Sequence, residues 1–115
     1  MKLFVEHYRT AAGKIPYLQW LTKLKDRTAK ATVIRRSIRI ELGDMGDHKS
    51  VSDGVWELRI DVGPGYRVYY GMAGKTVVLL LTAGDKGSQS RDIARAKDFW
   101  NDYQYRQSED QGQVK

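Results

Sequence analysis

The chain has 115 residues, which is enough for one hydrophobic core and too few for two domains. It contains no cysteine, which excludes disulfides and cysteine-ligated metals, and no apolar run of membrane-spanning length, so we expect a cytoplasmic protein without a membrane partner. Its formal net charge of +6 favours a polyanionic partner, nucleic acid above all.

The N-terminal part of the chain predicts a short strand followed by two helices. Apolar and polar residues alternate over 3–9, which indicates a strand. Pro16 suits the first turn of a helix that we expect to run to Lys25. Asp26 is a typical N-cap residue for a second helix through Leu42, whose apolar stripe would be Ala31, Ile34, Ile38 and Leu42. The break between the helices is short, so they should form an antiparallel hairpin on one side of a sheet.

The middle of the chain predicts a polar loop and three strands. Residues 43–54 are polar and predict a flexible loop. Residues 55–61 alternate with period two, which places two sets of side chains on opposite faces: Trp56, Leu58 and Ile60 against Glu57, Arg59 and Asp61. Gly63-Pro64-Gly65 should then reverse the chain into a second strand over 66–71. Residues 76–82 are too apolar for a solvated face, so this third strand should be covered on both sides.

A glycine-containing corner leads into a closing helix, expected over 90–104, with the core stripe Ile93, Ala96, Trp100 and Tyr103. Beyond Gln104 the periodicity is lost, so we expect one folded domain over 1–103 and a disordered tail over 104–115. The order β-α-α-β-β-β-α predicts a small α+β domain. Its sheet would be mostly antiparallel with about four strands, between an N-terminal helical hairpin and a C-terminal helix.

Four basic residues are candidates for binding a phosphate. Arg59 and Arg67 should project from adjacent strands. Lys86 lies in the corner before the last helix and Arg91 in its first turn, where backbone N–H groups already favour an anion. The alternative for the two arginines is that they are half-exposed strand residues paired with the carboxylates of the first hairpin strand, Glu57 and Asp61.

The polar loop and the second hairpin strand supply further candidates for RNA contacts. His48 carries the side chain that most often serves as an acid or base in such reactions and would suit cleavage of a phosphodiester, although loop histidines are more often bystanders, and Lys49 is next to it. Tyr69 shares the face of Arg67 and is the better candidate for stacking on a base, whereas the strand's other tyrosines share the apolar face. No cluster of histidines and carboxylates has metal-ligand spacing, and no phosphate-binding or dinucleotide motif occurs, so we expect neither a metal nor a cofactor.

Three segments carry a more specific signal: Gly54-Val-Trp-Glu-Leu-Arg59, Gly63-Pro-Gly-Tyr-Arg-Val-Tyr-Tyr70 and Leu79-Leu-Leu-Thr-Ala-Gly-Asp-Lys86, followed by Gln89 and Asp92-Ile93-Ala94-Arg95-Ala96. These segments closely resemble the RelE/ParE superfamily of toxins. Within it, they are similar to the HigB-like branch of phage-derived and addiction-module killer proteins. The resemblance covers about residues 1–103.

The resemblance implies a RelE-like microbial-ribonuclease fold and a type II toxin. Such toxins cut mRNA, usually in the ribosomal A site, and are neutralised by a cognate antitoxin that is commonly a helix-turn-helix protein. Arg67 matches the sheet arginine that family members use on the scissile phosphate, and Lys86 lies where others place a basic or histidine catalytic residue. Arg59 corresponds more loosely to their basic residues on the preceding strand. No residue plainly replaces the C-terminal tyrosine or histidine that other members use.

Three functions therefore stay open. In the first, a metal-independent endoribonuclease, the 2′-OH of the RNA attacks the adjacent phosphate while Arg67 and Arg59 stabilise the growing charge and Lys86 assists the leaving oxygen. The second is a ParE-like poison of DNA gyrase, and the third a non-catalytic nucleic-acid-binding protein. Clustered basic residues on the sheet favour cleavage.

Overall fold

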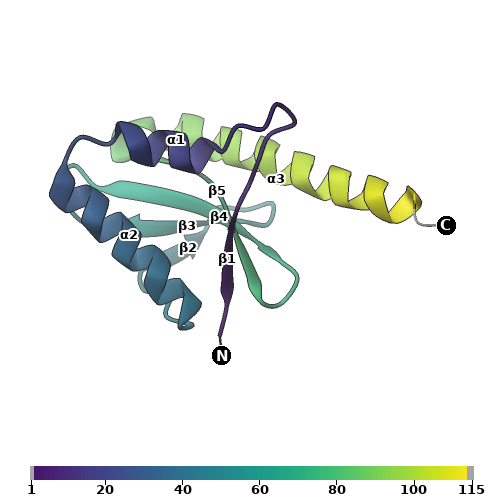
Figure 1. The fold of residues 1–115 in the computed structure, drawn as a ribbon. Helices are drawn as coiled ribbons and strands as arrows, with labels where there is room; N and C mark the ends of the chain where they lie inside the picture. Colours follow the sequence, from purple (N-terminus) through teal and green to yellow (C-terminus); the bar gives the residue numbers. More distant parts are fainter. Residues whose placement is uncertain (1, 114–115) are drawn as a thin grey trace.

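The computed structural model describes residues 2–113 and arranges them as one sheet with helices on both faces (Figure 1). The elements are, in chain order, β1 (Phe4–His7), α1 (Pro16–Lys23), α2 (Arg27–Glu41), β2 (His48–Ser50), β3 (Val55–Ile60), β4 (Tyr66–Ala73), β5 (Val77–Asp85), the 3-10 turn η1 (Lys86–Ser88) and α3 (Gln89–Gln113). The expected α+β class is confirmed, with every predicted helix and strand present.

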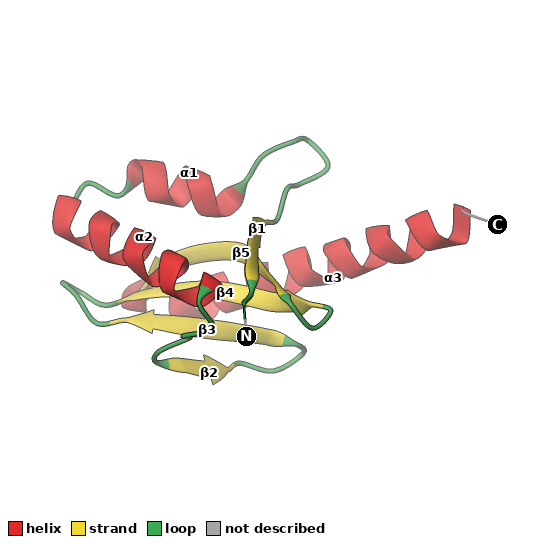
Figure 2. Cartoon of the chain, turned by 60° about the horizontal axis from the view of Figure 1, so that its bottom comes forward, coloured by secondary structure: helices red, strands yellow, loops and turns green. Residues whose placement is uncertain are grey.

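The sheet has five strands in the order β1-β5-β4-β3-β2, and it is mixed because β1 runs parallel to β5 while the other pairs are antiparallel. The prediction of about four strands is wrong because β2 forms within the expected loop. All three residues of β2 are exposed, and the strand lies at the sheet edge beside β3 (Figure 2). A short polar edge strand has no apolar alternation to reveal it, since its pairing is made by backbone groups.

The predicted hairpin of β3 and β4 is confirmed. Gly63 and Gly65 adopt φ values of +56° and +86°, which a side-chain-bearing residue rarely tolerates, and Pro64 lies between them. The turn sets a register in which Arg59 lies directly opposite Arg67 and Glu57 opposite Tyr69. Residues opposite one another in a sheet share a face, so the hairpin brings the two arginines together.

Two cores pack against the two faces of the sheet. Helices α1 and α2 cover the face that carries Leu58, Val68 and Leu80, and α3 covers the opposite face, where Trp100 and Ala96 pack on Leu79 and Leu81. Strand β5 alternates between the two cores, which confirms the prediction of a strand covered on both sides. The expected core stripe of α3 is also confirmed.

Helix α2 begins as predicted, since the Asp26 carboxylate accepts a hydrogen bond from the Ala29 N–H at 3.1 Å. The apolar stripe predicted for α2 lies on the wrong side of the helix. The side chains that α2 buries are Ala29, Val33 and Ile40, whereas the expected stripe of Ala31, Ile34, Ile38 and Leu42 is exposed. The reason is Arg36: its guanidinium donates to the carbonyls of Arg59, Met45 and Asp47, which fixes an arginine on the inner side of the helix.

Helix α3 continues to Gln113, beyond the expected end near Gln104, and its C-terminal part projects away from the sheet (Figure 1). Arg106 supports the extension by donating to the Arg9 carbonyl at 2.6 Å and pairing with Asp102 at 2.7 Å. Residues 114–115 of the expected tail lie outside the described residues, and the division at 103 stays a prediction. None of the helices within residues 2–113 is long and apolar enough to cross a bilayer.

Candidate functional site

A buried carboxylate organises the sheet face that α3 covers. The side chain of Glu57 on β3 is only 2% exposed. One of its oxygens accepts a hydrogen bond from Arg59 Nε at 3.2 Å, and the other accepts one from Gln89 Nε2 at 3.0 Å and lies 3.6 Å from Arg67 Nε. A buried carboxylate is stable only when it is paired and hydrogen-bonded. Glu57 therefore ties β3, β4 and the first turn of α3 together around two guanidinium groups.

The two arginines do pair with Glu57, as the alternative interpretation predicted, but no described ion pair joins either of them to Asp61. Their hydrogen-bond donors are not exhausted by these pairs. The side chain of Arg67 is 14% exposed and makes one hydrogen bond among the described residues, from Nη1 to the Tyr66 carbonyl at 3.3 Å. Its buried Nε has no hydrogen-bond partner there, since 3.6 Å is an ion-pair distance only. A guanidinium has five N–H donors, so Arg67 keeps donors for an anion. Arg59 is more open, at 34%.

Lys86 lies beside Arg67 at the end of β5. Its backbone N–H donates to the Gly65 carbonyl at 2.9 Å. A Cβ atom added to Gly65 would lie 3.7 Å from Arg67 Nη1 and 3.9 Å from Lys86 Cβ. The hairpin glycine thus leaves room between the two cationic side chains, and Lys86 is exposed. The structure brings Arg59, Arg67 and Lys86 to one region of the molecule.

The start of α3 is less open to an anion than the sequence suggested. The Asp85 carboxylate already accepts the Ser88 N–H at 3.1 Å, and the buried Asp92 accepts a hydrogen bond from the Ser88 hydroxyl. Two carboxylates of the chain therefore occupy the positive end of the helix dipole. Lys86 and Arg91 still line one shallow depression of about 370 Å³ at this corner.

The two candidates on β2 lie on opposite faces of the sheet. Lys49 pairs with Glu57, so it shares the face of the arginines, and it is exposed. His48 pairs with Leu58 and lies on the other face, where its ring centroid is 5.7 Å from that of Trp56. The structure therefore does not bring His48 together with Arg67.

The RNA-stacking role expected of Tyr69 does not fit its position. The residue shares the face of Glu57 as predicted, but α3 covers that face and leaves Tyr69 0% exposed. Burial, followed by the negative charges of Glu57 and Asp92, raises the pKa of its phenol, and its hydroxyl has no hydrogen-bond partner among the described residues. No face of the ring is free to stack on a base.

The sequence analysis named Glu57 only as a surface partner of the arginines and did not predict its burial, and it missed Gln89 as a site residue altogether. A glutamate in an alternating strand is expected to face solvent, and nothing local indicates that a distant helix will cover it. The available signal was the pair of arginines predicted on the same face, because two neighbouring guanidinium groups need a counter-charge once water is excluded.

The cluster can bind and polarise an anion. Two guanidinium groups and one ammonium group at a single site are suited to the charge that develops on phosphoryl oxygens during transfer. No group of three or more histidine or carboxylate side chains within residues 2–113 is placed to hold a metal ion. The expectation of a reaction without metal or cofactor stays a prediction.

Residues 19–99 match a family described as phage-derived Gp49-like proteins (DUF891). An uncharacterized protein of Haemophilus influenzae (strain ATCC 51907 / DSM 11121 / KW20 / Rd) is 51% identical over 78 residues, which is 68% of this chain and 79% of that protein. The chain belongs to the Gp49-like family. This family is of the RelE/HigB-like toxin type and is usually related to toxin–antitoxin systems, which suggests an antitoxin partner. The HigB-like branch itself stays a prediction.

Proposed function

We propose that this Gp49-like protein is the toxin of a type II toxin–antitoxin system and cleaves mRNA on the ribosome. Family membership supports the toxin role. The order of helices and strands supports a RelE-like fold, with β2 as an added edge strand. The observation that carries the nuclease chemistry is Arg67: a largely buried guanidinium with unused donors, flanked by Arg59 and Lys86.

In the proposed reaction the 2′-OH of the RNA attacks the adjacent phosphorus. The bond to the 5′ oxygen of the next nucleotide breaks, which leaves a 2′,3′-cyclic phosphate and a 5′-OH. The proton of the 2′-OH passes to solvent. Arg67 and Arg59 stabilise the charge on the phosphoryl oxygens, and Lys86 donates a proton to the leaving oxygen.

Glu57 has a positioning role in this scheme. Both of its carboxylate oxygens are engaged by Arg59, Arg67 and Gln89, so it orients the guanidinium groups and is not the base. Lys49 and Arg91 are exposed near the same cluster, and we assign them contacts with neighbouring phosphates of the RNA. Tyr69 is left out because it is buried, and His48 because it lies on the other face.

The test is a reconstituted translation system in which ribosomes are supplied or omitted, run beside a gyrase supercoiling assay. We expect the purified protein to cut mRNA only when translating ribosomes are present and to leave supercoiling unaffected. Intact mRNA with inhibited supercoiling would instead identify a gyrase poison. If both activities are absent from a folded protein, only the non-catalytic nucleic-acid-binding function is left.

A further inference from the structure

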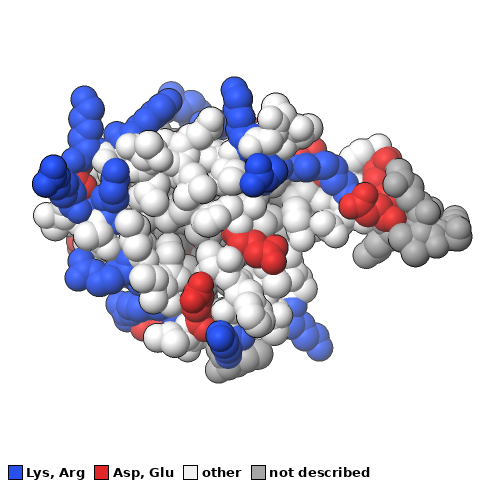
Figure 3. All heavy atoms as spheres, viewed as in Figure 1, with Lys and Arg blue, Asp and Glu red and all other residues white. Residues whose placement is uncertain are grey.

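The cationic side chains of the cluster do not by themselves distinguish RNA from DNA. Lysine and arginine side chains are spread widely over the face of the molecule in Figure 3, and such charge attracts the phosphates of either nucleic acid. The two nucleic acids differ at the ribose 2′-OH, which can donate a hydrogen bond. Arg59, Arg67 and Lys86 carry only N–H donors on their side chains, so none of them can accept it. A group that recognises the 2′-OH as a donor has to supply an acceptor.

Gln89 supplies a neutral acceptor next to the arginines. Its amide Nε2 donates to one oxygen of Glu57 at 3.0 Å, and Arg67 Nε lies 3.6 Å from the same oxygen. A carboxylate that is paired with guanidinium groups only accepts hydrogen bonds, so the amide has to present its NH₂ group to Glu57. The direction of the Gln89 amide is therefore fixed by its partner, and its carbonyl oxygen faces away from Glu57.

The carbonyl oxygen of Gln89 is accessible to a ligand. Among the described residues, the bond to Glu57 is the one hydrogen bond that this side chain makes. Within residues 2–113 the buried side-chain atoms without a partner are Arg67 Nε and the Tyr69 hydroxyl, so the Gln89 oxygen is not a buried orphan and solvent reaches it. Gln89 also lines the depression of about 370 Å³ beside Lys86. Its acceptor therefore lies between the arginine pair and the cations of that depression.

Two charged acceptors lie near the same cluster. Asp47 Oδ1 is 3.9 Å from Arg59 Nη1, and the Asp47 side chain is 62% exposed. The Asp85 carboxylate accepts the Ser88 N–H at 3.1 Å. A carboxylate repels the phosphates on both sides of a ribose, whereas an amide has no net charge. Gln89 is therefore the acceptor that can approach a ribose without opposing the binding of its phosphates.

We propose that the Gln89 amide oxygen accepts a hydrogen bond from the ribose 2′-OH beside the phosphate that Arg67 and Arg59 bind. The inference rests on the proposed function in taking RNA as the ligand. The contact makes Gln89 a specificity-determining residue, because a deoxyribose has no hydroxyl to donate and leaves the amide oxygen unpaired once the nucleic acid excludes water. It also directs the O–H away from the phosphorus, so that a lone pair of the 2′ oxygen can face it. The amide does not take the proton, which still passes to solvent.

The probes are two fluorescently labelled single-stranded oligonucleotides of one sequence, one with ribose and one with 2′-fluoro sugars. The fluorine keeps a similar sugar conformation but removes the O–H donor. Binding of each probe to the full chain is measured by fluorescence anisotropy at low salt, without ribosomes, so the result does not depend on cleavage. We expect the original chain to bind the ribose probe roughly five- to tenfold more tightly, which is the effect of about one hydrogen bond.

Two variants of Gln89 remove the acceptor in different ways. Gln89→Met removes the whole amide, so Glu57 loses a partner and both probes should bind more weakly. Gln89→Lys keeps a donor for Glu57 and adds a positive charge, so both probes should bind more tightly. In each variant the affinities for the two probes should become equal within about twofold. A purely structural role of Gln89 would change both affinities in parallel and leave their ratio as it is in the original chain.

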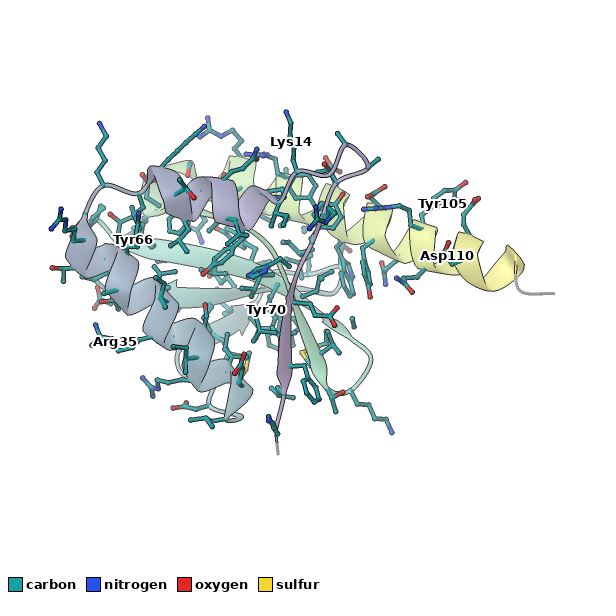
Figure 4. All side chains as sticks on the ribbon, in the orientation of Figure 1. Lys14, Arg35, Tyr66, Tyr70, Tyr105 and Asp110 are labelled. Carbon is teal, nitrogen blue, oxygen red and sulfur yellow. The ribbon has the colours of Figure 1, made fainter. Side chains whose placement is uncertain are left out.

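Three control variants should keep the ratio of the two affinities. Gln107→Met makes the same exchange on the projecting part of α3, and Arg35→Gln removes a charge from α2, where Figure 4 shows the side chain pointing outward. Asp47→Asn removes the charge of a competing acceptor and should tighten the binding of both probes alike. These three side chains are exposed, so circular dichroism should show the same fold for the controls and the original chain.

A preference for ribose that either Gln89 variant retains would overturn the proposal, and so would an original chain that binds the two probes equally or binds neither. Loss of the preference in Asp47→Asn would overturn it as well, because it would identify Asp47 as the acceptor. The two proposals fail separately. A chain that does not cut mRNA can still prefer ribose through Gln89, and a chain that cuts mRNA can do so without this contact.

Discussion

Glu57 shows how one buried charge can decide the geometry of a binding site. Its carboxylate accepts hydrogen bonds from Arg59 and Gln89 and forms an ion pair with Arg67. The Glu57 side chain is almost completely shielded from water. The two arginines would otherwise repel each other on adjacent strands. The site therefore depends on a residue that does not itself reach solvent.

Glu57→Gln tests this dependence. The amide keeps the size of the side chain but removes the charge that holds two guanidinium groups, so we expect the free energy of unfolding to fall by roughly 1–3 kcal/mol. Urea denaturation measures the loss. At a temperature where the variant is folded, its cleavage of ribosome-bound mRNA should also be slower, and Glu57→Asp should recover part of the rate because it keeps the charge. A Gln variant as stable and active as the original would show that Glu57 is dispensable.

Tyr8 couples the packing of α3 to pH. The residue is 3% exposed, and its hydroxyl donates to Asp102 at 2.5 Å. Burial, reinforced by Asp102, raises the pKa of the phenol to about 12. In the unfolded chain the phenol ionises near pH 10, so between about pH 10 and 12 the unfolded state has lost this proton while the folded state retains it. The contribution of Tyr8 to stability is complete below that window and is lost as the pH rises through it.

We therefore expect the free energy of unfolding to fall more steeply above about pH 10 in the original chain than in Tyr8→Phe. The variant lacks the titrating group and should be less stable at neutral pH, because it loses the hydrogen bond to Asp102. Denaturant titrations at a series of pH values measure both effects. An identical pH dependence for the two proteins would contradict the assignment.

At the scale of elements, α3 docks on the sheet through a contact that only glycine permits. A Cβ atom on Gly71 would lie 2.5 Å from two ring atoms of Trp100. We expect Gly71→Ala to destabilise the protein by roughly 1–3 kcal/mol, because the indole must move out of a packed core. Thermal unfolding followed by circular dichroism measures this. Gly87→Ala is the comparison and should cost less, since its Cβ would meet only the end of the Asp85 side chain, at 3.3 Å.

The elements that could be predicted are those with local signals. The hairpin turn at Gly63 and Gly65, the Asp26 cap and the apolar periodicity of α3 depend on neighbours in sequence, and the structure confirms them. The buried side of α2 could not be predicted from its sequence, because Arg36 faces inward and donates hydrogen bonds to backbone carbonyls of distant segments. Strand β2 was missed because its pairing is purely a backbone interaction.

The same division applies to the candidate site. Strand alternation was enough to put Arg59, Arg67 and Tyr69 on one face. The covering of that face by α3 was not visible in the sequence, so the burial of Tyr69 and the enclosure of Glu57 were missed. The position of His48 followed from the register of an unpredicted strand. Local sequence patterns predict which residues share a face of the sheet, whereas long-range packing decides which of those residues are exposed to solvent.

For the whole molecule, the two faces of the sheet differ in character. The face under α3 carries the proposed anion-binding cluster around Arg67, and the face under α1 and α2 borders an apolar groove. The net charge of +6 assists the proposed interaction with mRNA, because RNA is negatively charged.

The central claim is that the cluster around Arg67 performs the cleavage, and single-turnover cleavage of ribosome-bound mRNA by Arg67→Ala tests it most directly. We expect a folded variant with a rate lower by about 10²–10³, because one stabilising contact to the phosphoryl oxygens is lost. The original protein should leave a 2′,3′-cyclic phosphate and a 5′-OH. Cleavage by folded Arg67→Ala at the original rate would contradict the account, and so would products that end in a 5′-phosphate.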